Sequence, residues 1–411
     1  MKNLFCSFLV IGFVLSSGVF AQPELDTTFN GTGIQTVSFG IGASGGDAVV
    51  QSDNKIVMVG SCQPSTYQQC VARYNEDGSL DATFAQQGFL VNFGIGSGVR
   101  VALQNDGKII AGGSTRVDGG FPIYYNRVSL ARYTPDGVLD SSFGGGNVLF
   151  SAGMSLASPR AMIIQPDDGK IVIVGESSPW SIWPSIDTMG WIARYLPNGT
   201  PDTSFDGDGV RNITSSEQFI QTACTSVAVQ PDGKLLVGIR TSVQTPTYIL
   251  MRLNPDGSPD PTWGGGDGIV DVPAINTVRY NISNLEVMLD GRIVGTVYRN
   301  IVRFNPDGSL DNSFDGDGIR ELGSTAGDPY SLAISASGKI TMAGLAPSSM
   351  NYWKFAVYKF NADGSPETGF GDNGLLVLNP ISPGSNSNSS ACASARSSGR
   401  RSTGRPARRR R

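Results

Sequence analysis

Short apolar runs separated by polar turns follow one another along most of the chain. In residues 226–239 (SVAVQPDGKLLVGI), two runs of aliphatic and β-branched residues flank a Pro-Asp-Gly-Lys turn. Runs of this length and composition are typical of β-strands, and Asp-Gly favours a tight turn because glycine accepts a positive φ at little cost. The pattern therefore predicts a succession of β-hairpins.

Three motifs recur in a fixed order and divide the chain into six units. The first, Leu/Pro-Asp/Glu-x-x-aromatic, occurs seven times, at residues 25–29, 80–84, 139–143, 201–205, 259–263, 310–314 and 366–370. Each interval between copies contains a Gln-x-Asp-Gly-Lys-Ile-like turn, such as residues 104–109, and an Arg-aromatic-Asn-Pro-Asp-Gly-like segment, such as residues 303–308. Self-similarity with a period of 51 to 62 residues indicates a repeat architecture.

Each unit is predicted to contain four strands, A to D. Strand A follows the glycine after the aromatic residue, B and C flank the Asp-Gly-Lys turn, and D contains the Arg-aromatic pair. Four short antiparallel strands repeated around an axis predict an all-β β-propeller of six or seven four-stranded antiparallel blades, with the recurring Phe or Trp packed between neighbouring units. A β-solenoid fits less well because its coils are usually shorter.

Strand A occurs seven times, whereas strands B, C and D occur six times. Six blades therefore need either residues 33–39 or residues 374–379 as their last A strand, and the other is surplus. The alternative is that residues 374–379 begin a seventh blade.

The three motifs in this order resemble the bacterial delta-60 repeat family. The resemblance covers residues 23 to about 380. It implies a β-propeller and export, and it implies no activity, because none is established for that family.

The two ends differ from the repeats, which occupy residues 22–380. Residues 1–21 combine Lys2, an apolar stretch and small residues at positions 19 and 21, which predicts a cleaved signal peptide and a secreted or cell-surface protein. Residues 381–411 hold eight Arg, no acidic residue and no hydrophobic periodicity, which predicts a disordered tail. An out-of-frame C-terminus and a basic segment that binds acidic polymers are alternatives.

Composition narrows the range of functions. The chain has 53 Gly, 23 Pro and only 16% charged residues, which suits short strands and turns. It has no histidine, which excludes Ser-His-Asp and Cys-His catalytic sites and His-ligated metals. Without the tail arginines and Lys2, 22 basic residues face 35 acidic ones, a net charge of about −13 that disfavours nucleic-acid binding.

Antiparallel order places the A–B and C–D connections on one face, where the loops differ in every unit. Aromatic residues fall in or beside the C–D loops: Tyr124, Tyr125, Trp180, Trp183, Tyr352 and Trp353. Variable loops on a rigid scaffold often carry binding, and planar rings suit stacking on a glycan or peptide. The alternative is that these rings pack against adjacent blades at the rim.

The Asp-Gly-Asp-Gly turns are candidate calcium-binding sites. Asp206 and Asp208, and likewise Asp315 and Asp317, place alternate carboxylates as calcium loops do, but the terminal bidentate Glu of such loops is missing. Ordinary structural turns are the alternative, so Ca²⁺ is an optional ligand and no other cofactor is expected. Cys62 and Cys70 flank the first C–D loop and are expected to form either a disulfide or a free pair.

Taken together, the residues predict a monomeric binding or interaction scaffold for a surface glycan or protein, with no membrane span after signal cleavage. The alternative is a carboxylate-dependent hydrolase or lyase with its site at the propeller axis. The repeated turns already account for most of the acids, which favours a protein that is not an enzyme.

Overall fold

A computed structural model describes most of the repeat region and short parts of the two ends of the chain. The described residues are 8–11, 25–37, 44–62, 68–85, 87–92, 98–118, 124–150, 156–178, 188–213, 221–242, 248–272, 282–323, 327, 329–347, 353–378 and 395–397. Their regular elements are β-strands, as the sequence predicts. Within these ranges there is no helix, and so none long and apolar enough to cross a membrane.

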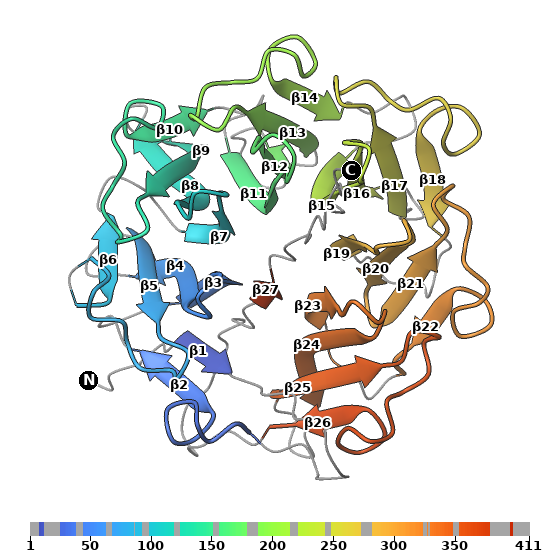
Figure 1. Cartoon of the computed structure of the whole chain (residues 1–411). Helices are drawn as coiled ribbons and strands as arrows, with labels where there is room; N and C mark the ends of the chain where they lie inside the picture. The colour runs from blue at the N-terminus through green and yellow to red at the C-terminus, as the bar shows by residue number, and fades with distance from the viewer. Residues whose placement is uncertain are drawn as a thin grey trace, which may run out of the picture.

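Antiparallel sheets stand around a central axis like the blades of a propeller (Figure 1). Three sheets have four strands each. The first contains β15 (Gln221–Val229), β16 (Leu235–Ser242), β17 (Tyr248–Leu253) and β18 (Ile269–Val272). The second contains β19 (Ile282–Val287), β20 (Ile293–Val297), β21 (Asn300–Phe304) and β22 (Ile319–Glu321), and the third contains β23 (Pro329–Ile334), β24 (Ile340–Pro347), β25 (Trp353–Phe360) and β26 (Leu375–Val377).

A fourth sheet has eight strands and consists of two antiparallel groups. They are β7 (Gly98–Leu103), β8 (Ile109–Asp118), β9 (Tyr124–Tyr133) and β10 (Asn147–Phe150), then β11 (Leu156–Ile164), β12 (Ile171–Ser178), β13 (Met189–Tyr195) and β14 (Val210–Ile213). A single parallel residue pair, Leu156 with Asn126, joins the two groups.

A fifth sheet contains β3 (Ser44–Val50), β4 (Ile56–Cys62), β5 (Gln68–Tyr74) and β6 (Phe89–Asn92), with the short β27 (Ala395–Ser397) added in parallel beside β3. A separate two-stranded sheet pairs β1 (Phe8–Ile11) with β2 (Ile34–Val37). β26 therefore completes the last sheet, and the first predicted A strand, β2, lies outside it.

Within each group of four, strand B lies innermost and the A strand of the next motif lies outermost (Figure 1). Both faces of the middle strands are buried, as in β12, because each sheet packs between two neighbours. One such core joins Val172 and Val174 of β12 to Val237 and Ile239 of β16. Burial on both faces explains why strand C reads as a continuous apolar run without alternation.

The recurring aromatic residue packs under a turn of the next unit. Phe84, Phe143, Phe205, Trp263 and Phe314 are each fully buried. Phe143, for example, lies against Gly199 of the following Pro-Asn-Gly turn, where a Cβ would come within 2.9 Å of the ring. This glycine has a φ of +87°, so both the turn and the close approach require glycine.

In the first five units, an arginine in strand D connects the unit to the next one. The Nε of Arg194 donates to Asp202 at 2.7 Å, its Nη2 donates to Ser204 at 3.1 Å, and its guanidinium lies 4.7 Å from the centroid of the Phe205 ring. Its Nη1 donates to the carbonyl of Pro255 in the next unit. We call this arrangement the arginine latch; the latch arginines are Arg73, Arg132, Arg194, Arg252 and Arg303.

Candidate functional site

Each innermost strand carries a β-bulge at the same place relative to its Asp-Gly-Lys turn. One extra residue interrupts the pairing of strand B with strand C; these residues are Gly46, Val99, Arg160, Thr225, Ser283 and Tyr330. Bulges re-aim side chains and end regular pairing, and they are frequent beside active sites. Here six of them surround one axis, at the inner edges of the sheets (Figure 1).

Small residues in strand C make room for the bulges. Gly175 lies opposite Pro159, and a Cβ on Gly175 would come 2.2 Å from the carbonyl oxygen of Ser158. Gly238 is similar, because a Cβ there would come 2.4 Å from Oγ of Ser226. The glycines of strand C therefore have a steric role in shaping the axis.

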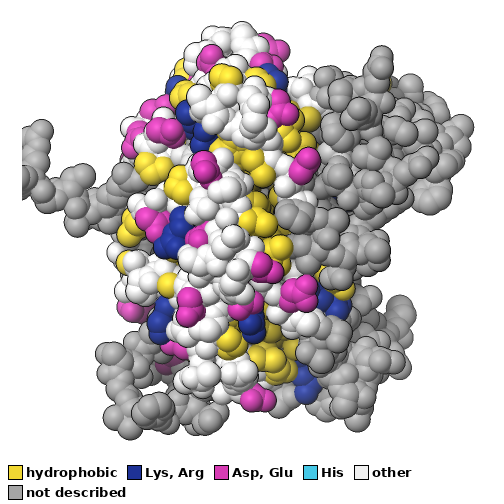
Figure 2. Space-filling view, turned by 90° about the vertical axis from the view of Figure 1, so that its right-hand side faces the viewer, with side chains coloured by type: hydrophobic (Ala, Val, Ile, Leu, Met, Phe, Trp, Pro, Cys, Tyr) yellow, Lys and Arg dark blue, Asp and Glu magenta, His cyan; other side chains and the backbone are white. Residues whose placement is uncertain are grey.

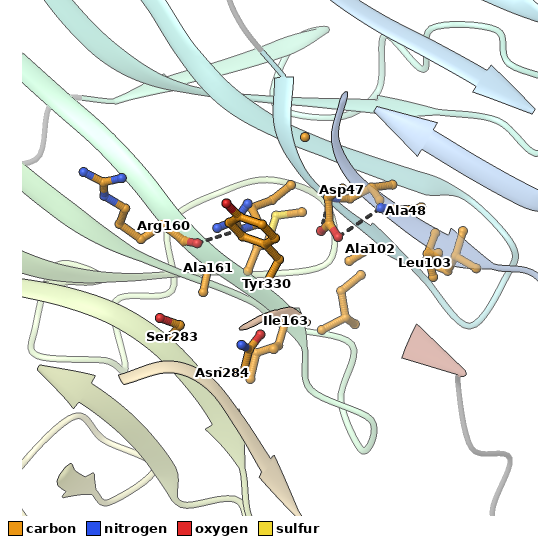
Figure 3. Close-up of a pocket in the computed structure, with 16 residues that line it drawn as sticks. Asp47, Ala48, Ala102, Leu103, Arg160, Ala161, Ile163, Ser283, Asn284 and Tyr330 are labelled. Atoms are coloured by element: carbon orange, nitrogen blue, oxygen red, sulfur yellow. Dashed lines mark hydrogen bonds between the residues drawn. The ribbon is translucent and has the colours of Figure 1, made fainter. Parts of the chain in front are cut away.

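A cavity of about 250 Å³ lies at the axis among these strands. Its lining comes from β3, β7, β11, β19 and β23 and includes four bulge residues, namely Gly46, Arg160, Ser283 and Tyr330. Figure 3 shows Tyr330 between Arg160 and Asp47 in the view drawn there. The lining also includes Val101, Ile163 and neighbouring aliphatic residues, so the cavity combines apolar side chains with a few polar groups.

Two charged residues of the lining are fixed by backbone contacts (Figure 3). Asp47 accepts hydrogen bonds from the backbone N–H of Ala48 at 2.9 Å and of Val101 at 3.1 Å. Arg100 donates from Nε to the carbonyl of Arg160 at 2.5 Å. These bonds connect β3, β7 and β11 across the inner edges of three strand groups.

A second charged cluster lies beside the cavity. Arg160 of β11 donates from Nε to Glu176 of β12 at 3.1 Å and also contacts this carboxylate through Nη2. Arg240 of β16 donates from Nη2 to the other oxygen of Glu176 at 3.2 Å. The Glu176 side chain is 13% exposed, whereas those of Arg160 and Arg240 are 50% and 36% exposed. One carboxylate thus holds two solvent-facing guanidinium groups.

The aromatic residues predicted to contact a ligand fall mostly where the structure gives no side chains. Trp180, Trp183 and Tyr352 lie outside the described residues, and so do the side chains of Tyr124 and Trp353. Tyr124 begins β9 and Trp353 begins β25. Tyr125 is 36% exposed. Their ligand role stays a prediction.

The proposed calcium carboxylates take part in their own turns. Asp206 accepts a hydrogen bond from Arg211 at 2.8 Å, and Asp315 accepts one from Arg320 at 3.1 Å. Asp208 and Asp317 accept the backbone N–H two residues on, from Val210 and Ile319, each at 2.8 Å. Within the described ranges, no three Asp, Glu, Cys or His side chains gather closely enough to hold a metal ion.

The cysteines occupy two different environments. Cys62, at the end of β4, and Cys70, the third residue of β5, form a disulfide with Cα atoms 5.9 Å apart. Cys224 is a buried free thiol, and burial, with a smaller contribution from the negative charge of Glu176, raises its pKa. A thiol held neutral in this way is a poor nucleophile.

The bulges and the Arg160–Glu176–Arg240 cluster are absent from the sequence predictions. Two signals for them exist in the sequence. Pro159 and Pro329 interrupt segments that otherwise read as strands, and proline within a sheet is confined to edges and bulges. Arg160, Glu176 and Arg240 are charged residues in predicted B and C strands, outside the three motifs.

Outside the cavity, the surface carries charges of both signs. On the face drawn in Figure 2, acidic and basic side chains are interspersed with hydrophobic ones.

The sequence matches the family described as a domain of unknown function (DUF5122) β-propeller over residues 51–84, 104–143, 191–205, 230–262, 289–314 and 336–370. One matched segment falls in each of the six units. This match supports the predicted β-propeller repeat family, while the narrower delta-60 assignment stays a prediction. No curated protein matches the sequence.

Several solved structures are similar to this chain. A protein of unknown function from Dyadobacter fermentans is 13% identical, with a TM-score of 0.47, and the match covers 77% of this chain and 94% of that one. An ulvan lyase is 9% identical, with a TM-score of 0.49 and coverage of 82% and 84%. An α-L-arabinanase from Penicillium chrysogenum, complexed with arabinobiose, is 8% identical, with a TM-score of 0.46 and coverage of 78% and 93%. The repeats, the sheet topology and the family match identify the chain as a β-propeller repeat protein.

Proposed function

We propose that the protein is an exported binding module that takes a surface glycan or a protein segment at the mouth of its propeller axis. One observation carries the proposal: bulges in the innermost strands surround a cavity of about 250 Å³ and bring Arg160, Ser283 and Tyr330 into its lining. Ligand sites combine apolar walls with a few fixed polar groups, and this cavity has that composition.

The proposal includes a ring of six complete blades. The strand groups β7–β10 and β11–β14 count as separate blades, because one residue pair joins them. β26 supplies the outer strand of the sixth blade, and β2 is surplus. Export rests on the signal-peptide pattern of residues 1–21, and the loops with Trp180 and Trp183 extend the proposed binding face.

A carboxylate-dependent hydrolase or lyase is the second candidate, favoured by the position of Asp47 in the cavity lining. Hydrolysis of glycosides by the common mechanism uses two carboxyl groups across the scissile bond. Among the described residues of the lining, Asp47 is the one carboxylate.

A glycan and peptide array, followed by a turnover assay on every retained ligand, tests the two candidates. Binding by the wild type without turnover supports the binding module, and turnover supports the enzyme.

We expect Tyr330→Ala to weaken retention at least about tenfold, because it removes a large contact surface from the cavity. The control is Leu289→Ala, in a B–C turn, where the side chain is 80% exposed. Equal retention by wild type and Tyr330→Ala would contradict an axial site.

A further inference from the structure

Arg160 owes its position to the bulge in β11. The bulge residue has no partner in β12, so its side chain leaves the regular alternation of the strand. Gly175 permits this geometry from the opposite strand. Arg160 therefore lies at the inner edge of its sheet, where its backbone carbonyl accepts from Arg100 and its side chain reaches Glu176.

Arginines outnumber carboxylates among the described residues at this point. In the part of the chain that the structure describes, the cavity lining and the adjoining cluster hold Arg100, Arg160 and Arg240 against Asp47 and Glu176. The whole chain has the opposite sign, with 31 basic and 35 acidic residues. Among the described residues, Glu176 is the one carboxylate that Arg160 and Arg240 contact.

The two guanidinium groups are also arranged to bind an anion. Each uses part of its donor set on Glu176, and both side chains remain substantially exposed to solvent. Arginine forms paired, charge-assisted hydrogen bonds to a planar carboxylate, which are stronger than neutral ones. Glu176 holds the two groups in place before a ligand arrives, which lowers the entropic cost of binding.

The rest of the lining suits a sugar ring. The exposed hydroxyl of Ser283 and the half-buried ring of Tyr330 belong to the same cavity as Arg160. Hydroxyl groups bind sugar hydroxyls, and an aromatic ring packs against the apolar face of a sugar. In Figure 3 the guanidinium group of Arg160 points away from Tyr330, and Arg240 lies outside the cavity lining. A chain of several pyranose rings that carry carboxylates would therefore be needed to contact both the cavity and the two arginines.

We infer that the axial site is selective for an acidic saccharide, with the carboxylate of a uronic acid bound by Arg160 and Arg240. This inference rests on the proposed binding function and adds the chemical class of the ligand. Sugar hydroxyls meet the neutral part of the cavity, and Glu176 acts as a positioning residue for both arginines.

The test compares two forms of one ligand, tetragalacturonate and its methyl ester, by isothermal titration calorimetry on the purified protein. The ester keeps the sugar chain and removes the charge. We expect the acid to bind at least about tenfold more tightly than the ester, and the difference to shrink as NaCl is raised from low to high concentration. Equal affinity for acid and ester would overturn the inference and leave a neutral-sugar binding module standing.

Variants locate the site. Arg240→Gln, Arg160→Gln and the double variant are expected to lose most of the preference for the acid, with circular dichroism confirming the fold. Arg240→Lys keeps the charge without the planar guanidinium group and is expected to retain an intermediate preference for the acid.

Arg211→Gln is the matched control, because this arginine also pairs with one carboxylate but lies in the outer strand β14. Full preference in the double variant, or no binding of tetragalacturonate by the wild type, would overturn the inference. Retention of other glycans in the array would still support the binding function.

Discussion

At the scale of single residues, the three sequence motifs meet at one carboxylate in each latch. Asp202 accepts from Ser204 through Oδ1, and its Oδ2 contacts Arg194 at 2.7 Å and Lys170 at 3.3 Å. Lys170 comes from the Asp-Gly-Lys turn and Arg194 from strand D. The recurring Asp, Lys and Arg residues of the motifs therefore form one ion-pair network, in addition to any role they have in turns. Sequence reasoning assigned only the turn role, because the pairing needs strands C and D side by side.

The latch aspartates make the stability of the fold depend on pH. Burial alone would raise the pKa of Asp202, but hydrogen bonds from Ser204, the charge of Arg194 and a hydrogen bond from Lys170 outweigh it and lower the pKa to about 2. The pKa of Asp311 is also lowered to about 2, by hydrogen bonds from Ser313 and Arg292 and the charge of Arg303, against the opposing effect of burial. Because the folded pKa lies below the ordinary value of 3.8, this stabilisation is complete above about pH 4 and lost as the pH falls towards 2.

We therefore expect Asp202→Asn to lower the free energy of unfolding by about 2 kcal/mol at pH 6, and the deficit to narrow as the pH approaches 2. Urea unfolding of wild type and variant at a series of pH values measures this. Asp232→Asn, where the carboxylate is 56% exposed, is the control and should change little. A deficit that stays constant from pH 6 to pH 2.5 would show that the charge of Asp202 does not cause it.

At the scale of the elements, the strands and turns followed from the hydrophobic pattern, but the bulges did not. The A strands predicted at residues 33–39 and 374–379 are β2 (Ile34–Val37) and β26 (Leu375–Val377) in the structure. Period and turn chemistry are local properties of the chain. A bulge depends on two strands that pair out of step, so it is visible only once the register between them is known.

The bulge in β11 gives an element-scale prediction. Gly175→Ala should destabilise the protein by about 1–3 kcal/mol, because the added Cβ would meet the backbone carbonyl of Ser158 and force the bulge to shift. Thermal unfolding measures the loss, and the acid preference of the axial site should fall with it, since Arg160 sits in this bulge. Gly369→Ala is the control, since no heavy atom lies within 4 Å of its added Cβ. Similar losses for both variants would contradict a steric role for Gly175.

At the scale of the whole molecule, the ring has a seam between the last and first strand groups. The two-stranded sheet β1–β2 lies there on the outer side, and β27 lies between β23 and β3 near the axis (Figure 1). Phe29 packs against Gly78 of the first group, as the other motif aromatics pack against theirs. In the sixth group, Lys359 and Glu367 replace the latch arginine and aspartate, and Lys359 contacts the Phe370 ring at 4.5 Å. The first strand group therefore keeps the aromatic contact at the seam, whereas the sixth strand group lacks the arginine latch there.

We expect β2 to exchange its backbone amide hydrogens at least about tenfold faster than β14. β2 pairs with β1 in a two-stranded sheet, and the proposed signal cleavage would remove β1, whereas β14 is the outer strand of a sheet held by its latch. Hydrogen exchange read by mass spectrometry on the mature protein measures both strands in one experiment. Equal protection of β2 and β14 would mean that another segment pairs with β2 in the mature chain.

The sequence by itself determined the repeat, the four strands of each unit, the turns between them and the propeller class. These are set by hydrophobic period and turn residues, which act over a few neighbouring positions. Only the tertiary structure decided that β26 and not β2 completes the last sheet, that the motif charges form latches between units, and that Arg160 and Arg240 share Glu176 beside the axis. Arg160 and Arg240 lie on strands of different sheets, far apart in sequence. Their meeting depends on strand register and on how sheets pack around the axis, which no local pattern encodes.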